Sequence, residues 1–177
     1  MSGDVLLTKK QRQIVTLFVI AIVVIALDQA TKMLAVAHLK ETHLSYLGDT
    51  IRLYYAENIG AWGGLGDSAP PLVRMILLTI LPSVVLIGFT VHLLRDPNLK
   101  SLMVYALGFI VAGGTGNIID RVRQGYVVDF MWMGVGPVGT NIFNVADMAI
   151  MLGAGLFLVD AITQKKVPAE SSTATET

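Results

Sequence analysis

Long apolar runs separated by short polar stretches dominate the chain, and their lengths are typical of membrane spans. A helix needs about 20 mostly apolar residues to cross a bilayer. Pro70-Pro71 suits the first turn of one such helix, and Pro82 is expected to kink it. We therefore predict an all-α membrane protein with four transmembrane helices, at residues 14–37, 72–94, 99–117 and 142–162.

The segment between the first two predicted helices alternates between apolar and polar side chains. Residues 44–47 and 50–55 have the period of short strands, and Gly48-Asp49 between them suits a tight turn. The Gly-rich residues 58–64 are expected to lack regular structure, and the apolar residues 131–137 to rest on the membrane surface. Trp62 and Trp132 are expected in outer loops, where indole suits the membrane interface.

One folded domain is expected over residues 13–163, between an N-terminal segment, 1–12, and a disordered Ser/Thr/Glu-rich tail, 164–177. Four spans place both termini on one side of the membrane. Basic residues in the short flanks make that side the cytoplasm, so the loops 38–70 and 120–141 are predicted to face outward.

The first apolar run also has features of a secretory leader. Basic residues precede it, and Ala35-Val36-Ala37 has the pattern of a cleavage site. However, the charges of Asp28 and Lys32 interrupt the approach to that site, and we expect an uncleaved helix.

The composition agrees with a membrane protein and excludes several kinds of site. Hydrophobic residues make up 54% of the 177 residues and charged residues 15%, against roughly 25% charged in soluble domains. The net charge is zero, so no nucleic-acid partner is implied. Without Cys there is no thiol nucleophile or thiolate metal site, and the His residues have no metal-ligand spacing, so neither a metal nor another cofactor is expected.

Two carboxylates at the ends of apolar runs are the first candidates for catalysis. Asp147 falls in the first turns of the fourth predicted helix, on the same face as Asn144, and Asp129 lies in the loop before it. Ionisable groups at membrane depth are costly and usually functional. If the loop folds back, the two acids share a proton and can activate water. The alternative is a helix-dipole charge at Asp147 and a solvated Asp129.

A second polar set follows the small residues 113–116 in the third predicted helix. Asn117, Asp120 and Arg121 share one face if the helix continues that far, and Gly113 would allow close packing. Arg121 could hold the carbonyl groups of an extended peptide or brace a loop, or simply extend to the interface from a helix end.

Asp28 and Lys32 are spaced i, i+4 at the outer end of the first predicted helix. The simplest interpretation is a salt bridge between them. They could also orient the loop that carries Asn58. The residues alone leave a small ion-coupled carrier and a helical scaffold open beside a protease.

Taken together, these clusters resemble the lipoprotein signal peptidase family, signal peptidase II, over residues 14–163. Five blocks occur in the family's order, and their number and order make the resemblance specific. The blocks are Asp28-Gln29 with Lys32, Asn58-x-Gly60-Ala61, Gly113-Gly114-x-Gly116-Asn117-x-x-Asp120-Arg121, Val127-Val128-Asp129-Phe130 and Phe143-Asn144-x-Ala146-Asp147.

The resemblance implies an intramembrane aspartyl endopeptidase with four transmembrane helices and a small extracytoplasmic β-cradle. Such enzymes remove the signal peptide of bacterial prolipoproteins just before a diacylglyceryl-modified Cys, at the outer face of the cytoplasmic membrane. It also implies membrane lipids as partners, inhibition by globomycin-type peptide antibiotics, and a monomer.

By motif, Asp129 and Asp147 correspond to the catalytic pair and Asp28 and Lys32 to bracing residues. The corresponding substrate-binding or dyad-supporting residues are Asn58, Gly60, Gly113, Asn117, Asp120, Arg121, Asn144 and Ala146. Residues 62–66 depart from the family pattern, and a more mobile gating loop is expected there.

Overall fold

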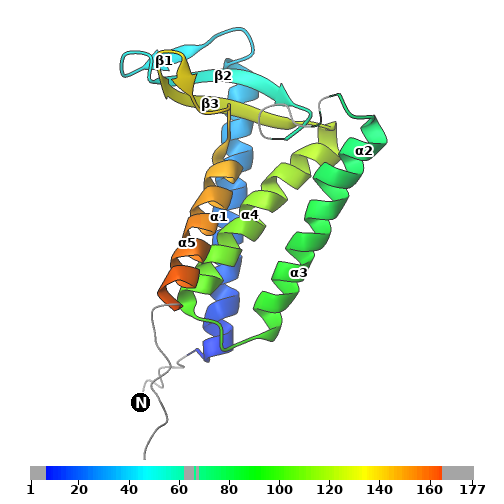
Figure 1. The fold of residues 1–177 in the computed structure, drawn as a ribbon, viewed down its shortest axis with the longest axis vertical. Coiled ribbons are helices and arrows are strands. Elements are labelled where there is room, and N and C mark those ends of the chain that lie inside the picture. The colour runs from blue at the N-terminus through cyan, green and yellow to red at the C-terminus, as the bar shows by residue number, and fades with distance from the viewer. Residues whose placement is uncertain (1–6, 62–65, 67, 165–177) are drawn as a thin grey trace, which may run out of the picture.

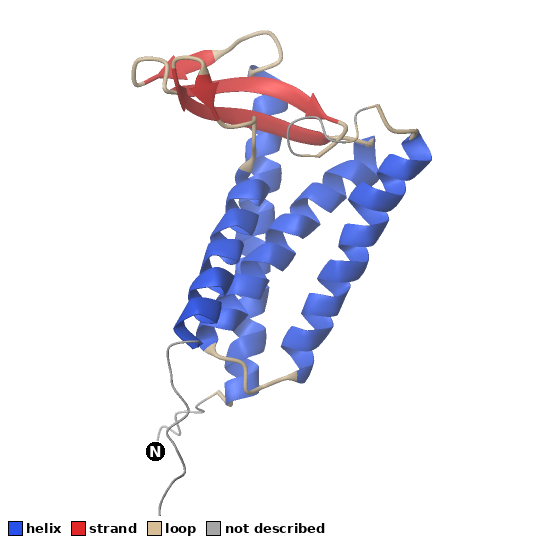
Figure 2. Cartoon of the chain, in the orientation of Figure 1, coloured by secondary structure: helices blue, strands red, loops and turns tan. Residues whose placement is uncertain are grey.

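A computed structural model describes residues 7–61, 66 and 68–164 of the chain, which form a helical bundle beneath a small sheet (Figures 1 and 2). The helical elements are α1 (Lys9–His38), α2 (Pro71–Met75), η1 (Ile76–Ile80), α3 (Leu81–Arg95), α4 (Ser101–Gln124) and α5 (Val145–Gln164). The strands are β1 (Leu44–Tyr46), β2 (Ile51–Asn58), β3 (Val127–Val135) and β4 (Val138–Gly139).

Four helices of the described residues are long and apolar enough to cross a membrane, as predicted: α1, the continuous stretch from α2 to α3, α4 and α5. Their bounds differ from the prediction. α1 begins at Lys9, within the segment expected to precede the domain, and α4 continues past Asn117 to Gln124. The predicted span ended at Asn117, but Asp120 and Arg121 remain helical, because Asp120 pairs with Lys32 and Arg121 donates to the carbonyl of Gly60.

The second span is interrupted close to the predicted kink at Pro82. The π-helical turn η1 (Ile76–Ile80) comes directly before α3, whose first turn contains that proline. A proline cannot donate the next helical hydrogen bond, and π turns are one of the ways in which a helix accommodates such a gap. The irregularity expected from the sequence therefore takes the form of a wide turn just before Pro82.

The sheet has the order β1-β2-β3-β4, with all neighbours antiparallel. The β1–β2 hairpin confirms the predicted pair of strands, and Leu47, Gly48 and Asp49 in its turn all have positive φ angles. The prediction of an irregular segment from residue 58 is wrong at Asn58, which ends β2. The prediction of a loop over 120–141 is also wrong, because this range contains the end of α4 and both β3 and β4.

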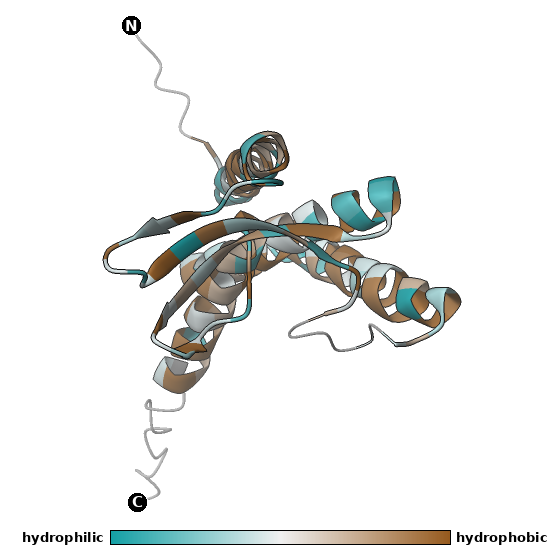
Figure 3. Ribbon diagram, turned by 90° about the horizontal axis from the view of Figure 1, so that it is seen from above, coloured by the Kyte–Doolittle hydropathy of each residue, from teal (hydrophilic) through white to brown (hydrophobic). Residues whose placement is uncertain are grey.

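α4 lies at the centre of the bundle and packs against α1, α3 and α5 (Figure 1). Small residues such as Ala106, Ala112 and Gly113 are buried there, which lets the helices approach closely. Large apolar side chains are exposed on the outside of the helices, which appear mostly brown in Figure 3. An apolar exterior of this extent fits a lipid environment.

The first and last described residues lie at the end of the bundle opposite the sheet, so both ends of the folded part are on one side (Figure 1). The predictions for Trp62, for the gating residues 62–65, for the first residues and for most of the tail fall outside the described residues.

Candidate active site

Asp129 and Asp147 come from different elements and meet at one residue, Asn144. The amide Nδ2 of Asn144 donates to Oδ1 of Asp129 at 2.7 Å, and its backbone N–H donates to Oδ2 of Asp147 at 3.1 Å. Asn144 is completely buried. The two carboxylates that the sequence left 18 positions apart are therefore held by a single amino acid.

The chain returns to Asp129 through backbone pairing between β3 and the segment before α5. The carbonyl of Phe143 accepts from the backbone N–H groups of Phe130 and Met131, and the N–H of Phe143 donates to the carbonyl of Met131. Asn144 then caps α5, because its Oδ1 accepts from the backbone N–H of Asp147 at 2.9 Å. This pairing fixes both the start of the helix and the distance between the two acids.

Two further amides complete the surroundings of the carboxylates. Asn58 at the end of β2 donates to Oδ2 of Asp129 at 2.8 Å, and Asn117 on α4 donates to Oδ1 of Asp147 at 2.8 Å. Each of the four carboxylate oxygens thus accepts one hydrogen bond. Such donors orient both acids and stabilise their charged form.

Asp129 is almost fully buried in β3, outside the membrane-spanning helices. Burial raises its pKa to about 6, and the nearby charge of Asp147 raises the pKa as well, whereas the hydrogen bonds from Asn58 and Asn144 and the charge of Lys32 lower it. A carboxyl group with a pKa in this range can hold or release a proton near neutral pH.

A buried ionic cluster lies directly beneath the two acids. Lys32 on α1 forms ion pairs of 2.8 Å with both Asp28 and Asp120, and donates to Oδ1 of Asn117 at 3.0 Å. The predicted Asp28–Lys32 pair is confirmed, but the second pair with Asp120 joins α1 to α4 and was not predicted. Charges removed from water in this way need partners on all sides.

The two carboxylates of this cluster also hold the backbone beside the acids. Asp28 accepts from the N–H of Ala146 at 2.9 Å, and Asp120 accepts from the N–H of Val128 at 3.2 Å. Ala146 and Val128 are the residues immediately before Asp147 and Asp129. The cluster is therefore connected to the position of each acid through one peptide unit.

Gln29 belongs to the same cluster and was not recognised as a site residue from the sequence. Its Nε2 donates to Asp120 at 2.9 Å, to Asp28 at 3.2 Å and, more weakly, to the carbonyl of Gly116 at 3.4 Å. Two signals were available: Gln29 belongs to the Asp28-Gln29 block, and it is an uncharged polar residue within an apolar run.

Arg121 and Gly60 lie on the sheet side of the two acids. Nη2 of Arg121 donates to the carbonyl of Gly60 at 2.9 Å, and the N–H of Gly60 donates to Oδ1 of Asn58 at 3.1 Å. A chain of contacts thus leads from Arg121 to Asp129. Nε of Arg121 is buried and has no acceptor among residues 7–61, 66 and 68–164, which leaves one donor for another oxygen atom.

Gly113 and Gly116 set the distance between the helices below the site. A Cβ atom at Gly113 would overlap the carbonyl oxygen of Ala146, and one at Gly116 would lie 2.7 Å from Oδ2 of Asp28. The predicted close packing at Gly113 is therefore present, and it is the first turn of α5 that packs there.

Eleven of the twelve residues predicted for the site take part in these hydrogen bonds and ion pairs, and the twelfth, Gly113, packs against Ala146. Within the described part of the chain, no three His, Cys, Asp or Glu side chains are grouped so as to hold a metal ion. The arrangement is suited to acid–base chemistry by two carboxyl groups, with a cationic guanidinium nearby.

The chain matches the family model described as signal peptidase (SPase) II over residues 20–163. It is 36% identical to a lipoprotein signal peptidase of Pelodictyon phaeoclathratiforme, over 89% of this chain and 95% of that protein. It is 35% identical to a lipoprotein signal peptidase of Brevibacillus brevis, over 84% of this chain and 96% of that protein.

Solved structures of bacterial membrane enzymes have the same fold. One superimposes with a TM-score of 0.76 at 26% identity and covers 90% of this chain and 94% of its own. Another has a TM-score of 0.71 at 26% identity, with 83% and 92% covered.

Proposed function

The chain belongs to the signal peptidase II family of membrane peptidases, and on this basis we propose that it removes signal peptides from bacterial prolipoproteins with Asp129 and Asp147 as the catalytic pair. The observation that carries this proposal is the shared contact with Asn144, which holds both carboxylates beside each other. Among the described residues, the surrounding donors are amides that orient the acids without neutralising them.

The reaction proceeds by general acid–base catalysis with one proton on the pair. The ionised carboxylate takes a proton from a water molecule as the water oxygen bonds to the carbonyl carbon of the scissile peptide. The protonated carboxyl group donates its proton to the carbonyl oxygen. In the second step, the acid that gained a proton gives it to the leaving nitrogen, the C–N bond breaks, and the diol returns its proton to the other carboxylate.

The buried setting strengthens these steps. Little water surrounds Asp129, so hydrogen bonds to the developing tetrahedral centre count for more than in bulk solvent. The unpaired Nε of Arg121 can bind a carbonyl oxygen of the substrate backbone beside the scissile bond. Asn58, Gly60 and Asn117 keep Arg121 and the two acids in this arrangement.

The position of the site supports a lipid-modified substrate. Asp147 is in the first turn of α5, where the bundle meets the sheet, and we take this end of the apolar spans to lie at the depth of the lipid headgroups. A peptide whose Cys carries diacylglycerol presents its scissile bond at that depth. We therefore place the cleavage just before this Cys, and we expect globomycin-type peptides to inhibit by occupying the same site.

The same proposal gives the chain its location. It acts as a monomer among the lipids of the bacterial cytoplasmic membrane, with both termini in the cytoplasm and the sheet and active site at the outer face. The positions of the described ends opposite the sheet support this orientation (Figure 1).

The test is cleavage of a fluorogenic diacylated lipopeptide by the purified protein. Asp129→Asn and Asp147→Asn are each expected to lower kcat by at least about 1,000-fold, since the pair acts as a unit. Asp49→Asn, which changes an exposed carboxylate in the hairpin turn, is the matched control and is expected to retain activity. Cleavage at a near wild-type rate by either of the first two variants would disprove the catalytic assignment.

A further inference from the structure

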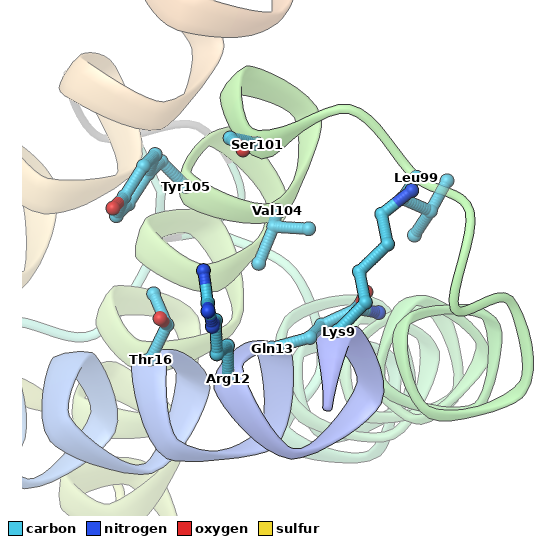
Figure 4. Close-up of a pocket in the computed structure, with 8 residues that line it drawn as sticks. All are labelled: Lys9, Arg12, Gln13, Thr16, Leu99, Ser101, Val104 and Tyr105. Atoms are coloured by element: carbon cyan, nitrogen blue, oxygen red, sulfur yellow. The ribbon is translucent and has the colours of Figure 1, made fainter. Parts of the chain in front are cut away.

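A second site lies at the opposite end of the bundle, between the first turns of α1 and α4. A hollow of about 270 Å³ is bounded there by Lys9, Arg12, Gln13, Thr16, Leu99, Ser101, Val104 and Tyr105 (Figure 4). Ligand pockets for drug-sized molecules measure about 300–1,000 Å³. This hollow is therefore suited to a small group or to one end of a larger molecule.

The lining of the hollow favours an anion. Lys9 and Arg12 extend from α1 on the two sides of Val104, and the hydroxyl-bearing residues Thr16, Ser101 and Tyr105 complete its polar surface (Figure 4). No carboxylate is among the lining residues, and no ion pair of the described part of the chain involves either cation. Arg12 donates through Nε to the carbonyl of Leu7, which leaves its terminal nitrogens for other acceptors.

The wall of the hollow is fixed by a buried polar contact. Nε2 of Gln13 donates to the carbonyls of Leu93 and Asp96, so α1 is attached to the last turn of α3 and to the residue that follows that helix. The first turn of α4 has no side-chain cap, and its partial positive charge adds to that of the two cations.

The depth of the hollow matches that of lipid phosphates. α1 has 30 residues and is therefore about 45 Å long, whereas the hydrocarbon core of a bilayer is about 30 Å thick. The excess of about 15 Å allows the polar first turn of α1, which contains Lys9 and Arg12, to reach the headgroup layer. Leu99 and Val104 add apolar surface on which the start of an acyl chain can lie.

We propose that this hollow binds the phosphate headgroup of an anionic phospholipid, with Lys9 and Arg12 as the phosphate ligands. Basic pockets between transmembrane helices commonly bind such headgroups. The site is separate from the two acids, at the other end of the bundle. The proposal therefore does not depend on the mechanism given above.

The test measures binding of phosphatidylglycerol to the delipidated protein in mixed micelles at about 0.15 M salt, where diffuse attraction between exposed charges is largely screened. Lys9→Gln combined with Arg12→Gln is expected to weaken binding about 10- to 30-fold. The neutral change Ser101→Trp, which fills the hollow, is expected to weaken binding similarly. Phosphatidylcholine is expected to bind the unchanged protein much more weakly than phosphatidylglycerol.

Lys10→Gln combined with Arg95→Gln is the matched control. It removes the same charge from exposed positions at the same end of the bundle that do not line the hollow. It is expected to change binding less than about threefold. All variants are expected to keep the wild-type circular dichroism spectrum and a cooperative melting transition in detergent, which shows that they are folded.

Equal losses in the two double variants would overturn the proposal, because the attraction would then be diffuse. Full binding by Ser101→Trp would also overturn it. A competition experiment tests the assignment to a lipid. If inorganic phosphate displaces the bound lipid as effectively as a soluble short-chain phosphatidylglycerol does, that assignment is wrong.

Discussion

The carboxylate of Asp28 accepts a hydrogen bond of 2.9 Å from the backbone N–H of Ala146, across 118 positions of the chain. Asp120 makes the equivalent contact with the N–H of Val128. Both carboxylates are paired with Lys32, so one ammonium group stabilises two contacts, each of which holds the residue before a proposed catalytic acid. The spacing of the dyad thus depends on charges beneath it that need not touch the substrate.

Lys32 is therefore expected to be the most sensitive residue outside the dyad. Lys32→Met leaves two buried carboxylates without their cation, and breaking a buried ion pair from one side costs about 3–5 kcal/mol. We expect a large loss of thermal stability in detergent, measured by tryptophan fluorescence, together with loss of activity. Lys10→Met, at an exposed lysine in the first turn of α1, is the control and is expected to leave both unchanged. A Lys32→Met protein as stable as wild type would contradict this role.

Gln29 is expected to affect catalysis more than folding. In Gln29→Leu both carboxylates keep Lys32 but lose a shared donor, so Asp28 and Asp120 can shift and the acids they position follow. We expect kcat to fall about tenfold with little change in KM, because an interaction with the transition state is weakened rather than substrate binding.

The control for Gln29 is Gln124→Leu, at an exposed position at the end of α4, which is expected to be neutral. Gln29→Glu should be worse than Gln29→Leu, because it adds a third carboxylate beside two others. A rise in KM at constant kcat would indicate a role in binding instead and would rule out positioning.

The pH dependence of cleavage should respond to Asn58. Its hydrogen bond stabilises the ionised form of Asp129 and so lowers the pKa of a group that burial has raised to about 6. In Asn58→Ala this donor is lost, the protonated form is favoured, and the pKa of Asp129 rises further. Because the two acids titrate as a pair, both limbs of the pH–rate profile should move to higher pH.

The comparison for Asn58 is Asn141→Ala, at an exposed position before α5, whose profile should match that of the wild type. A shift of the Asn58→Ala profile to lower pH would contradict the assigned donor role.

The sequence predicted those helices and strands that leave an apolar run or an alternating pattern of apolar and polar residues in their own segment. The apolar runs gave the four spans, and the alternation around Gly48-Asp49 gave the β1–β2 hairpin. β3 was missed because residues 127–130 are all buried, so they show no alternation, and Asp129 interrupts the short apolar run that would otherwise indicate a buried strand.

The candidate site shows the same limit. Motif order singled out Asp129 and Asp147 as the candidate acids, but the attachment of each acid through the preceding peptide unit depends on Asp28 and Asp120, whose partners are distant in sequence. The end of α4 was placed too early for a related reason. Asp120 lies beyond the apolar run that marks the span, and only the fold supplies Lys32 as its partner.

The packing of α4 on α5 gives a last prediction, at Gly113. A methyl group there would overlap the carbonyl oxygen of Ala146, which is rigid backbone in the first turn of α5 and adjoins Asp147. Gly113→Ala should therefore push the start of α5 away from α4 and strongly reduce cleavage, even though alanine is the better helix former by about 1 kcal/mol. Gly155→Ala, in the same helix pair but with nothing within 4 Å of the added carbon, should keep full activity and equal or higher thermal stability. Measuring kcat and melting temperature for both variants separates the steric effect of the added methyl group from its effect on helix propensity. Normal activity of Gly113→Ala would show that the distance between α4 and α5 does not control the positions of the two acids.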